Sequence, residues 1–177
     1  TQSANIAQGV NKDGLDQGAG DQGMMFGYAC EETESYNELK GRYFPLAAAL
    51  SQRLSRRLTT VREEGILPWA RPDGKSQVTV QYDSNGDIEK VHTVVIAIQH
   101  DNTLKDQFEG SEEQELAYVE EQIKQHVVEH SIPSELLSAG YKLVVNGTGR
   151  FADPGGPYAD AGLTGRKIIV DTYGGMG

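Results

Sequence analysis

The sequence is almost free of cysteine, and this scarcity excludes a disulfide-stapled fold. Cys30 is the only cysteine among 177 residues, so no disulfide can form within the chain. No apolar run approaches the length of a membrane-spanning helix, and nothing resembles a signal peptide. We therefore expect a cytoplasmic protein without a membrane partner.

Positive charge is also scarce. The 16 lysines and arginines are outnumbered by 26 aspartates and glutamates, which gives a formal net charge of −10. Nucleic acid is therefore not a favoured partner, and any polyphosphate site must be a local basic patch. The length suffices for one ordinary domain with a core, and no internal repeat is visible.

The most informative stretch runs from Asp160 to Gly175 and reads DAGLTGRKIIVDTYGG. Its first glycines permit a tight turn, and Arg166 and Lys167 follow side by side. A guanidinium grips phosphate oxygens with two parallel bonds and an ammonium adds a compact charge, which favours a polyanion site. A turn with a surface Arg–Lys pair is an equally good interpretation. The β-branched run 168–170 predicts a short buried strand.

Two stretches have the periodicity of amphipathic helices. After Pro45, apolar residues recur at three- and four-residue spacing as far as Val61. Ser111–Gln114 resembles a capping box and precedes a second apolar stripe. His126 and His130 lie four residues apart on this second helix. We favour helix-end histidines that interact with the helix dipole over a shared metal site.

The remaining periodicity is that of β-strands. The run 78–82 alternates, Ser84–Asp87 is a good hairpin turn, and the return strand extends to about Gln99. Tyr141–Val145 predicts a third strand and 168–170 a fourth. We therefore predict an α+β fold with a mixed sheet and two amphipathic helices.

Residues 1–23 are rich in Gly, Gln, Asn and Asp, which predicts a loop. The segment Gly18–Gly23 formally fits the dinucleotide fingerprint G-x-G-x-x-G. We reject that interpretation because the polar residues before it do not form a strand. A flexible glycine loop that carries Asp21 remains.

Four stretches, in the same order, resemble the methionine adenosyltransferase family, also called S-adenosylmethionine synthetase. They are Gln17–Tyr28 (QGAGDQGMMFGY), Leu67–Thr79 (LPWARPDGKSQVT), Gly149–Phe151 (GRF) and the stretch from Asp160 to Gly175. The opening Gln2–Val10 also looks like the mobile active-site loop of this family. The resemblance covers almost the whole chain.

This resemblance implies one repeat of a three-domain fold, in which similar α+β domains are interleaved along a full-length subunit. Residues 30–153 would form one nearly complete domain. Residues 1–29 would be a mobile loop and a segment of a neighbouring domain, and residues 154–177 an active-site loop and strand of a further domain. Full-length relatives are expected to be homodimers or homotetramers.

The family joins L-methionine to ATP. The sulfur attacks the ribose 5′ carbon, the whole triphosphate leaves, and it is then cut to diphosphate and phosphate. The resemblance implies Mg²⁺ and K⁺ as cofactors. A strongly anionic leaving group requires fixed cations in a water-poor site.

The resemblance also implies an ATP site. Its residues would be Asp73, Gly74, Lys75, Arg150, Phe151, Asp160, Arg166 and Lys167. Lys75, Arg166 and Lys167 would face the phosphates as catalytic cations. Phe151 would stack on adenine with Arg150 beside it.

Three further roles follow from the same motifs. Asp160 would lie at the methionine or ribose end, where its carboxylate would favour the sulfonium product as a catalytic group. Gln2 matches a loop glutamine that contacts methionine, and Asp21 would lie near the active site.

The chain also departs from the family pattern. It begins after the family's His-Pro-Asp motif and ends before its Lys- and Asp-bearing stretch, which carry the main metal ligands, so we assign no metal ligand within it. We expect an internal fragment that is inactive alone; the alternative is a non-catalytic nucleotide-binding or assembly domain. Asn146-Gly-Thr replaces Asn-Pro-Thr, Ala159 stands where glycine is usual, and Asp153-Pro154 lengthens its loop.

Overall fold

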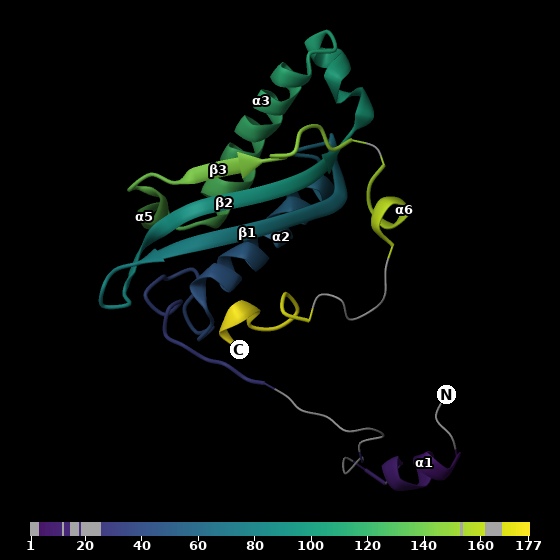
Figure 1. Ribbon diagram of the computed structural model, residues 1–177, viewed down its shortest axis with the longest axis vertical. Helices are drawn as coiled ribbons and strands as arrows, with labels where there is room; N and C mark the ends of the chain where they lie inside the picture. The colour runs from purple at the N-terminus through teal and green to yellow at the C-terminus, as the bar shows by residue number, and fades with distance from the viewer. Residues whose placement is uncertain (1–3, 12, 15–17, 19–25, 153, 162–167) are drawn as a thin grey trace.

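The computed structural model describes residues 4–11, 13–14, 18, 26–152, 154–161 and 168–177, and it has the predicted α+β architecture (Figure 1). In chain order the elements are α1 Ala4–Val10, α2 Leu46–Glu63, β1 Ala70–Tyr82, β2 Ile88–His100, η1 Asn102–Phe108, α3 Glu112–Ile123, η2 Lys124–Val128, α4 Glu129–Ser131, α5 Ser134–Leu137, β3 Lys142–Val145, α6 Pro157–Asp160 and η3 Gly174–Met176. None of the helices among these residues is both long and apolar enough to cross a membrane.

Helix α2 confirms the first predicted amphipathic stripe. Pro45 lies at the N-cap position, and Glu64 caps the C-terminus before Gly65 turns the chain with a φ of 70°. The Glu32 carboxylate accepts a hydrogen bond from the Leu46 N–H at 2.7 Å, so a distant side chain satisfies one of the free amides of the first turn. The buried face consists of Leu46, Ala49, Leu50, Leu54, Leu58 and Val61.

The predicted hairpin is confirmed as strands β1 and β2, which pair antiparallel. In the turn, the Asp83 N–H donates to the Asp87 carbonyl at 2.9 Å, and Gly86 adopts a φ of 88° that favours glycine. Strand β1 begins at Ala70, earlier than the alternating run indicated. The register shifts between Ala70 and Gly74, so this first part of the strand is irregular.

Strand β3 pairs with β2 in parallel, which confirms the mixed sheet with the order β1-β2-β3. Asn146 extends this pairing beyond the strand. Its backbone N–H donates to the Ile96 carbonyl at 2.9 Å, and its side-chain oxygen accepts from the Ile98 N–H at 2.8 Å. Asn146 adopts a φ of 47°, a conformation that asparagine tolerates better than most residues.

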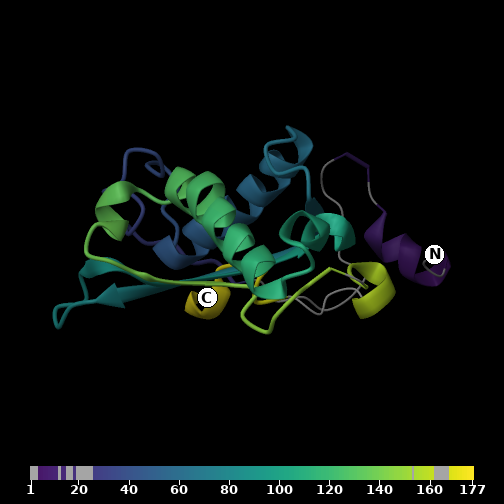
Figure 2. The same ribbon diagram turned by 90° about the horizontal axis from the view of Figure 1, so that it is seen from above.

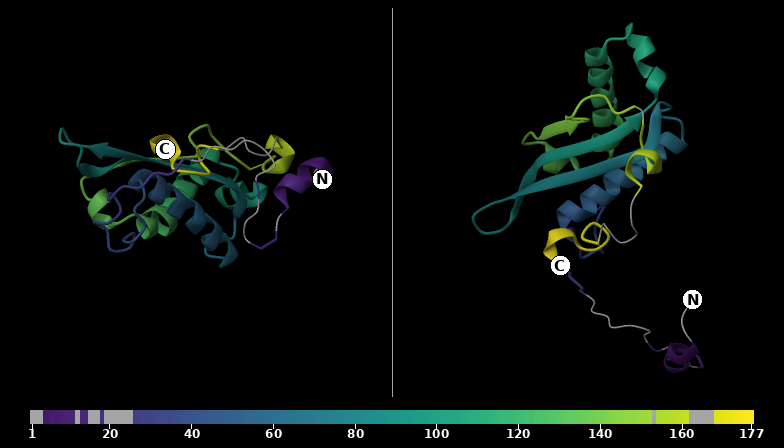
Figure 3. Two further views of the ribbon diagram at one scale, coloured as in Figure 1. Left: turned by 90° about the horizontal axis from the view of Figure 1, so that it is seen from below. Right: turned by 45° about the vertical axis from the view of Figure 1, so that its right-hand side comes forward.

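Helices α2 and α3 lie on the same face of the sheet (Figures 2 and 3). Helix α3 begins as predicted, because the Ser111 side chain accepts a hydrogen bond from the Gln114 N–H at 3.4 Å. The π-helical turn η2 follows it, and the carbonyl of His126 in this turn accepts a hydrogen bond from Arg57 Nε at 2.9 Å. The core fills the space between these helices and the inner face of the sheet.

Two predictions of local structure are wrong. Residues 4–10 form the short helix α1 rather than a loop, because alanine and glutamine favour a helix despite the polar composition. Residues 168–170 lie in turns, and Ile168, Ile169 and Val170 are 64%, 56% and 70% exposed. A β-branched run becomes a strand only when a neighbouring strand pairs with it, and the sheet described here pairs only β1, β2 and β3.

Candidate functional site

Asp73 and Lys75 lie on the outer face of strand β1, away from helix α2. Between them, Gly74 is turned toward the side of helix α2, where an added Cβ would lie 3.2 Å from Ile98 Cδ1 and 3.4 Å from Leu58 Cδ1. Because side chains alternate along a strand, the two charged residues share the opposite face. Asp73 is half-buried and Lys75 is exposed, opposite Ala97 in the register.

The loop after β3 crosses this end of the sheet. The His100 N–H donates to the Phe151 carbonyl at 3.0 Å, and the Gly156 N–H donates to Asp73 Oδ2 at 2.7 Å. Phe151 is half-buried. The structure therefore joins the strand of Asp73 to the loop that follows Phe151, two segments that belong to separate motifs.

Gln99, which sequence reasoning missed, packs against this loop. Its Nε2 donates to the Ala152 carbonyl at 3.1 Å. At Gly155 an added Cβ would lie within 2.5 Å of the amide nitrogen and oxygen of Gln99, so only glycine fits without a shift. Gln99 occupies the end of β2, but a single glutamine at a strand end carries no sequence signal of such a role.

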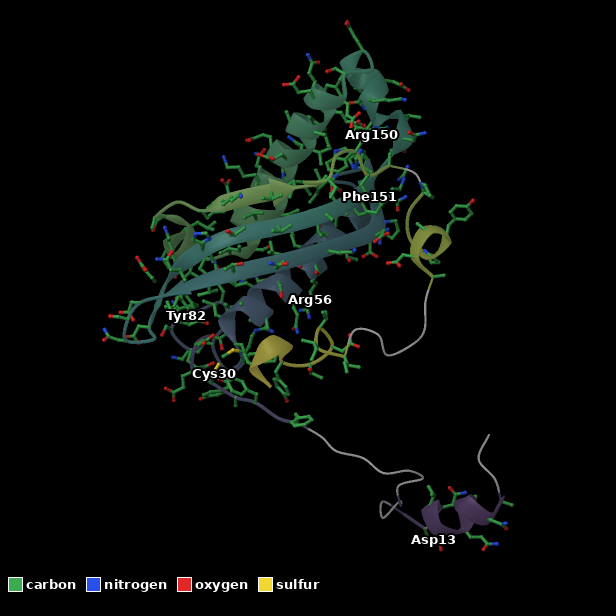
Figure 4. All side chains as sticks on the ribbon, in the orientation of Figure 1. Asp13, Cys30, Arg56, Tyr82, Arg150 and Phe151 are labelled. Carbon is green, nitrogen blue, oxygen red and sulfur yellow. The ribbon has the colours of Figure 1, made fainter. Side chains whose placement is uncertain are left out.

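Arg150 is anchored by protein groups. Its Nε donates to Glu115 Oε2 at 2.7 Å, while Nη1 donates to Asn102 Oδ1 at 2.8 Å and Nη2 donates to the Asn102 carbonyl at 2.6 Å. The Glu115 side chain is completely buried and that of Arg150 is 20% exposed. Figure 4 shows Arg150 and Phe151 at the same end of the sheet. Sequence reasoning missed Glu115, because it lies in an acidic first helical turn that is typical of a solvent-exposed face.

His100 lies beneath this anchor and is completely buried. Its Nε2 is 3.5 Å from Glu115 Oε1 without the geometry of a hydrogen bond, and Trp69 packs edge-on at a ring-centroid distance of 6.5 Å. Burial lowers the pKa of His100, because removing water disfavours the imidazolium; the Ile98 carbonyl and the Glu115 carboxylate oppose this shift only partly. We infer that His100 is neutral at pH 7.

Asp160, the last residue of α6, is exposed. Its backbone N–H donates to the Gly156 carbonyl at 3.1 Å, so the short helix is joined to the same loop that Asp73 holds. The other predicted site residues, namely Gln2, Asp21, Arg166 and Lys167, lie outside the described residues. The roles predicted for all of these residues stay predictions.

Metal donors do not converge in the described part of the chain. No three His, Cys, Asp or Glu side chains there come together in an arrangement that could hold a metal ion.

The described residues form two open grooves. They have volumes of about 630 and 870 Å³ and are formed by residues 168–177 with parts of α2 and neighbouring segments. Neither groove is lined by Asp73, Lys75, Arg150 or Phe151. These two grooves therefore do not coincide with these four predicted residues.

Comparisons with known proteins agree with the order of the motifs. The family described as "S-adenosylmethionine synthetase, central domain" matches residues 16–151, and "S-adenosylmethionine synthetase, C-terminal domain" matches residues 154–177. The S-adenosylmethionine synthase of Nocardioides sp. is 48% identical over 186 aligned residues, covering 99% of this chain and 42% of that protein. That of Clostridium botulinum is 47% identical, covering 99% of this chain and 43% of the relative. The chain thus spans less than half of each relative. Because the family models match most of its residues, the chain belongs to the S-adenosylmethionine synthetases.

Proposed function

We propose that this chain forms part of the ATP site of a methionine adenosyltransferase. The observation that carries the proposal is the contact between the strand of Asp73 and the loop that follows Phe151. The Gly156 N–H makes this contact by donating a hydrogen bond of 2.7 Å to Asp73. A cation on the strand and an aromatic ring on the loop are the groups that a nucleoside triphosphate requires at its two ends.

In this proposal Lys75 binds the triphosphate. Its ammonium is exposed on the outer face of β1, on a strand that also pairs tightly with β2. The strand fixes the backbone from which the flexible lysine side chain extends, so the ammonium can reach a phosphate oxygen without a change in the fold. Arg166 and Lys167 would add further cations.

The reaction proposed for the whole protein consumes ATP, L-methionine and water. The methionine sulfur donates an electron pair to the ribose 5′ carbon, and the bond from this carbon to the triphosphate oxygen breaks. Water then cleaves the triphosphate to diphosphate and phosphate. Asp160 would favour the sulfonium of S-adenosylmethionine electrostatically, and Gln2 would contact methionine.

The remaining parts of the proposal concern the whole protein. Mg²⁺ would neutralise phosphate charge and K⁺ would assist. The main ligands of both ions would be residues other than those described in this chain. We further propose a homodimer or homotetramer in the cytoplasm; a single cysteine suits that reducing compartment.

The test compares ATP binding by the chain with that of two lysine variants, by titration calorimetry. Lys75→Met should weaken ATP binding about tenfold, the effect of losing one charge-assisted contact. Lys105→Met removes the same charge from an exposed position on η1 and should leave the affinity unchanged. Equal affinity of the wild-type chain and Lys75→Met would contradict the assignment.

A second measurement addresses catalysis. With ATP, methionine, Mg²⁺ and K⁺ present, we expect no S-adenosylmethionine from the chain alone. Formation of product would mean that these residues suffice for the reaction, and it would contradict the proposed division of the site.

A further inference from the structure

The segment that carries Phe151 is fixed on both sides by groups to which no role in the reaction is assigned. On one side, Arg150 is bound by Glu115 and Asn102. On the other, the Phe151 carbonyl accepts from the His100 N–H at 3.0 Å. Phe151 is half-buried as a residue, so part of it remains accessible.

The guanidinium of Arg150 has little capacity left for a ligand. It donates through all three nitrogens to Glu115 and Asn102, and Nη2 makes a second contact with Glu115 Oε1 at 3.4 Å. A buried carboxylate paired in this way strongly opposes any movement of its partner, because separation would leave a buried charge uncompensated.

We propose that Glu115 is a positioning residue that presents Phe151 to the adenine ring by locking Arg150 in place, and that Arg150 itself is an anchor rather than a phosphate ligand. This inference rests on the proposed function and deepens it. A rigid aromatic group binds a base more tightly than a mobile one, since less conformational freedom is lost on binding.

The proposal separates two halves of the ligand. Adenine recognition should depend on Glu115, whereas triphosphate recognition should depend on Lys75. Inorganic tripolyphosphate, which has no base, therefore serves as an internal control. A general structural defect would weaken its binding as well as that of ATP.

The experiment measures the affinities of ATP and tripolyphosphate for the chain by titration calorimetry. Glu115→Gln keeps the shape of the side chain but removes its charge and places an amide donor beside the Arg150 donors. We expect ATP binding to weaken about tenfold, within the range for loss of one base-stacking contact, and tripolyphosphate binding to stay at the wild-type value.

Two further variants keep the test decisive. Asn102→Ala changes an exposed residue and removes only the Oδ1 acceptor of Arg150, so it should weaken ATP binding less but in the same direction. Glu113→Gln removes an equal charge from the exposed side of the same helical turn and should change neither affinity. The fluorescence of Trp69 would reveal whether Glu115→Gln folds. If it does not, the ATP affinity of Asn102→Ala decides whether the anchoring of Arg150 matters for adenine binding.

Wild-type ATP affinity in both Glu115→Gln and Asn102→Ala would overturn the inference, and so would equal weakening of ATP and tripolyphosphate binding. Failure of the proposed function has a different signature, because the wild-type chain itself would then bind neither compound.

Discussion

The Asp73 carboxylate accepts a hydrogen bond of 2.7 Å from the backbone N–H of Gly156, a residue 83 positions further along the chain. This bond joins the outer face of strand β1 to the loop that leads from Phe151 to α6. Asp73 therefore has a structural task as well as the predicted contact with the nucleotide. A ligand that binds here must either accommodate this bond or replace it.

Asp73→Ala should release the loop. We expect faster hydrogen exchange of the Gly156 amide and a loss of about 1 kcal/mol in the free energy of unfolding, the usual contribution of one hydrogen bond. Asp73→Asn retains an oxygen acceptor and should keep most of the protection. Unchanged exchange at Gly156 in Asp73→Ala would show that the bond contributes nothing in solution.

Gly155→Ala should destabilise the fold through Gln99. The new Cβ would fall within 2.5 Å of the Gln99 amide, which must then move and give up its hydrogen bond to Ala152. We expect a loss of about 1 kcal/mol in urea unfolding, for one broken hydrogen bond. Gly175→Ala is the control, because nothing lies within 4 Å of its added Cβ.

A double-mutant cycle sharpens this prediction. Gln99→Ala removes the obstructing amide, so adding Gly155→Ala to it should cost little. The two substitutions should therefore be non-additive by about 0.5 kcal/mol or more, as is usual for residues in contact. Additive effects would mean that Gly155 is required for its backbone alone.

The elements that the sequence predicted correctly are those whose signals are local. Helix α2 repeats its apolar residues at helical spacing, and the β1–β2 hairpin combines alternation with a glycine-bearing turn. Both patterns can be read within a few residues, because the periodicity and the turn chemistry already specify the backbone conformation.

The contacts that the sequence could not predict join distant positions. Glu115 is buried only because Arg150, 35 residues later, neutralises it. In isolation, a glutamate in an acidic first turn is indistinguishable from a solvent-exposed one. Residues 168–170 show the opposite error: their composition favours a strand, but strand formation depends on a partner that local sequence does not reveal.

Glu34 should control access of protease to the loop before α2. Its carboxylate accepts the backbone N–H groups of Gly41, Arg42 and Tyr43 at 2.8–3.1 Å, and the bonds from Tyr43 and Gly41 are the main reason that its pKa is lowered. Glu34→Ala should therefore accelerate tryptic cleavage after Arg42. Glu31→Ala, at an exposed position in the same loop, should not.

The effect of pH on this loop has a defined sign. A carboxyl group with a lowered pKa stabilises the folded loop above its unfolded pKa, and the contribution disappears as the pH falls through the folded value. Cleavage of the wild-type loop by an acid-tolerant protease should accordingly increase in acid, whereas Glu34→Ala should be cleaved readily throughout. A wild-type loop that resists cleavage equally at neutral and at acidic pH would contradict this account.

His100 should make the whole fold sensitive to mild acid. Burial lowers its folded pKa below the unfolded value of about 6.5, so the unfolded chain binds the proton more readily. Stability is therefore complete above about pH 6.5 and falls as the pH approaches the lower folded pKa. Urea unfolding followed by Trp69 fluorescence at about pH 7.5 and 5.5 would measure this loss.

Two histidine variants identify the source of the pH dependence. His100→Gln cannot titrate, so the difference in stability between the two pH values should shrink, although the variant is less stable at both because its side chain packs less well against Trp69. His92→Gln changes an exposed histidine and should retain the wild-type difference. If His100→Gln kept the full difference, the sensitivity would arise from other groups, and the buried imidazole would not be the residue that couples folding to pH.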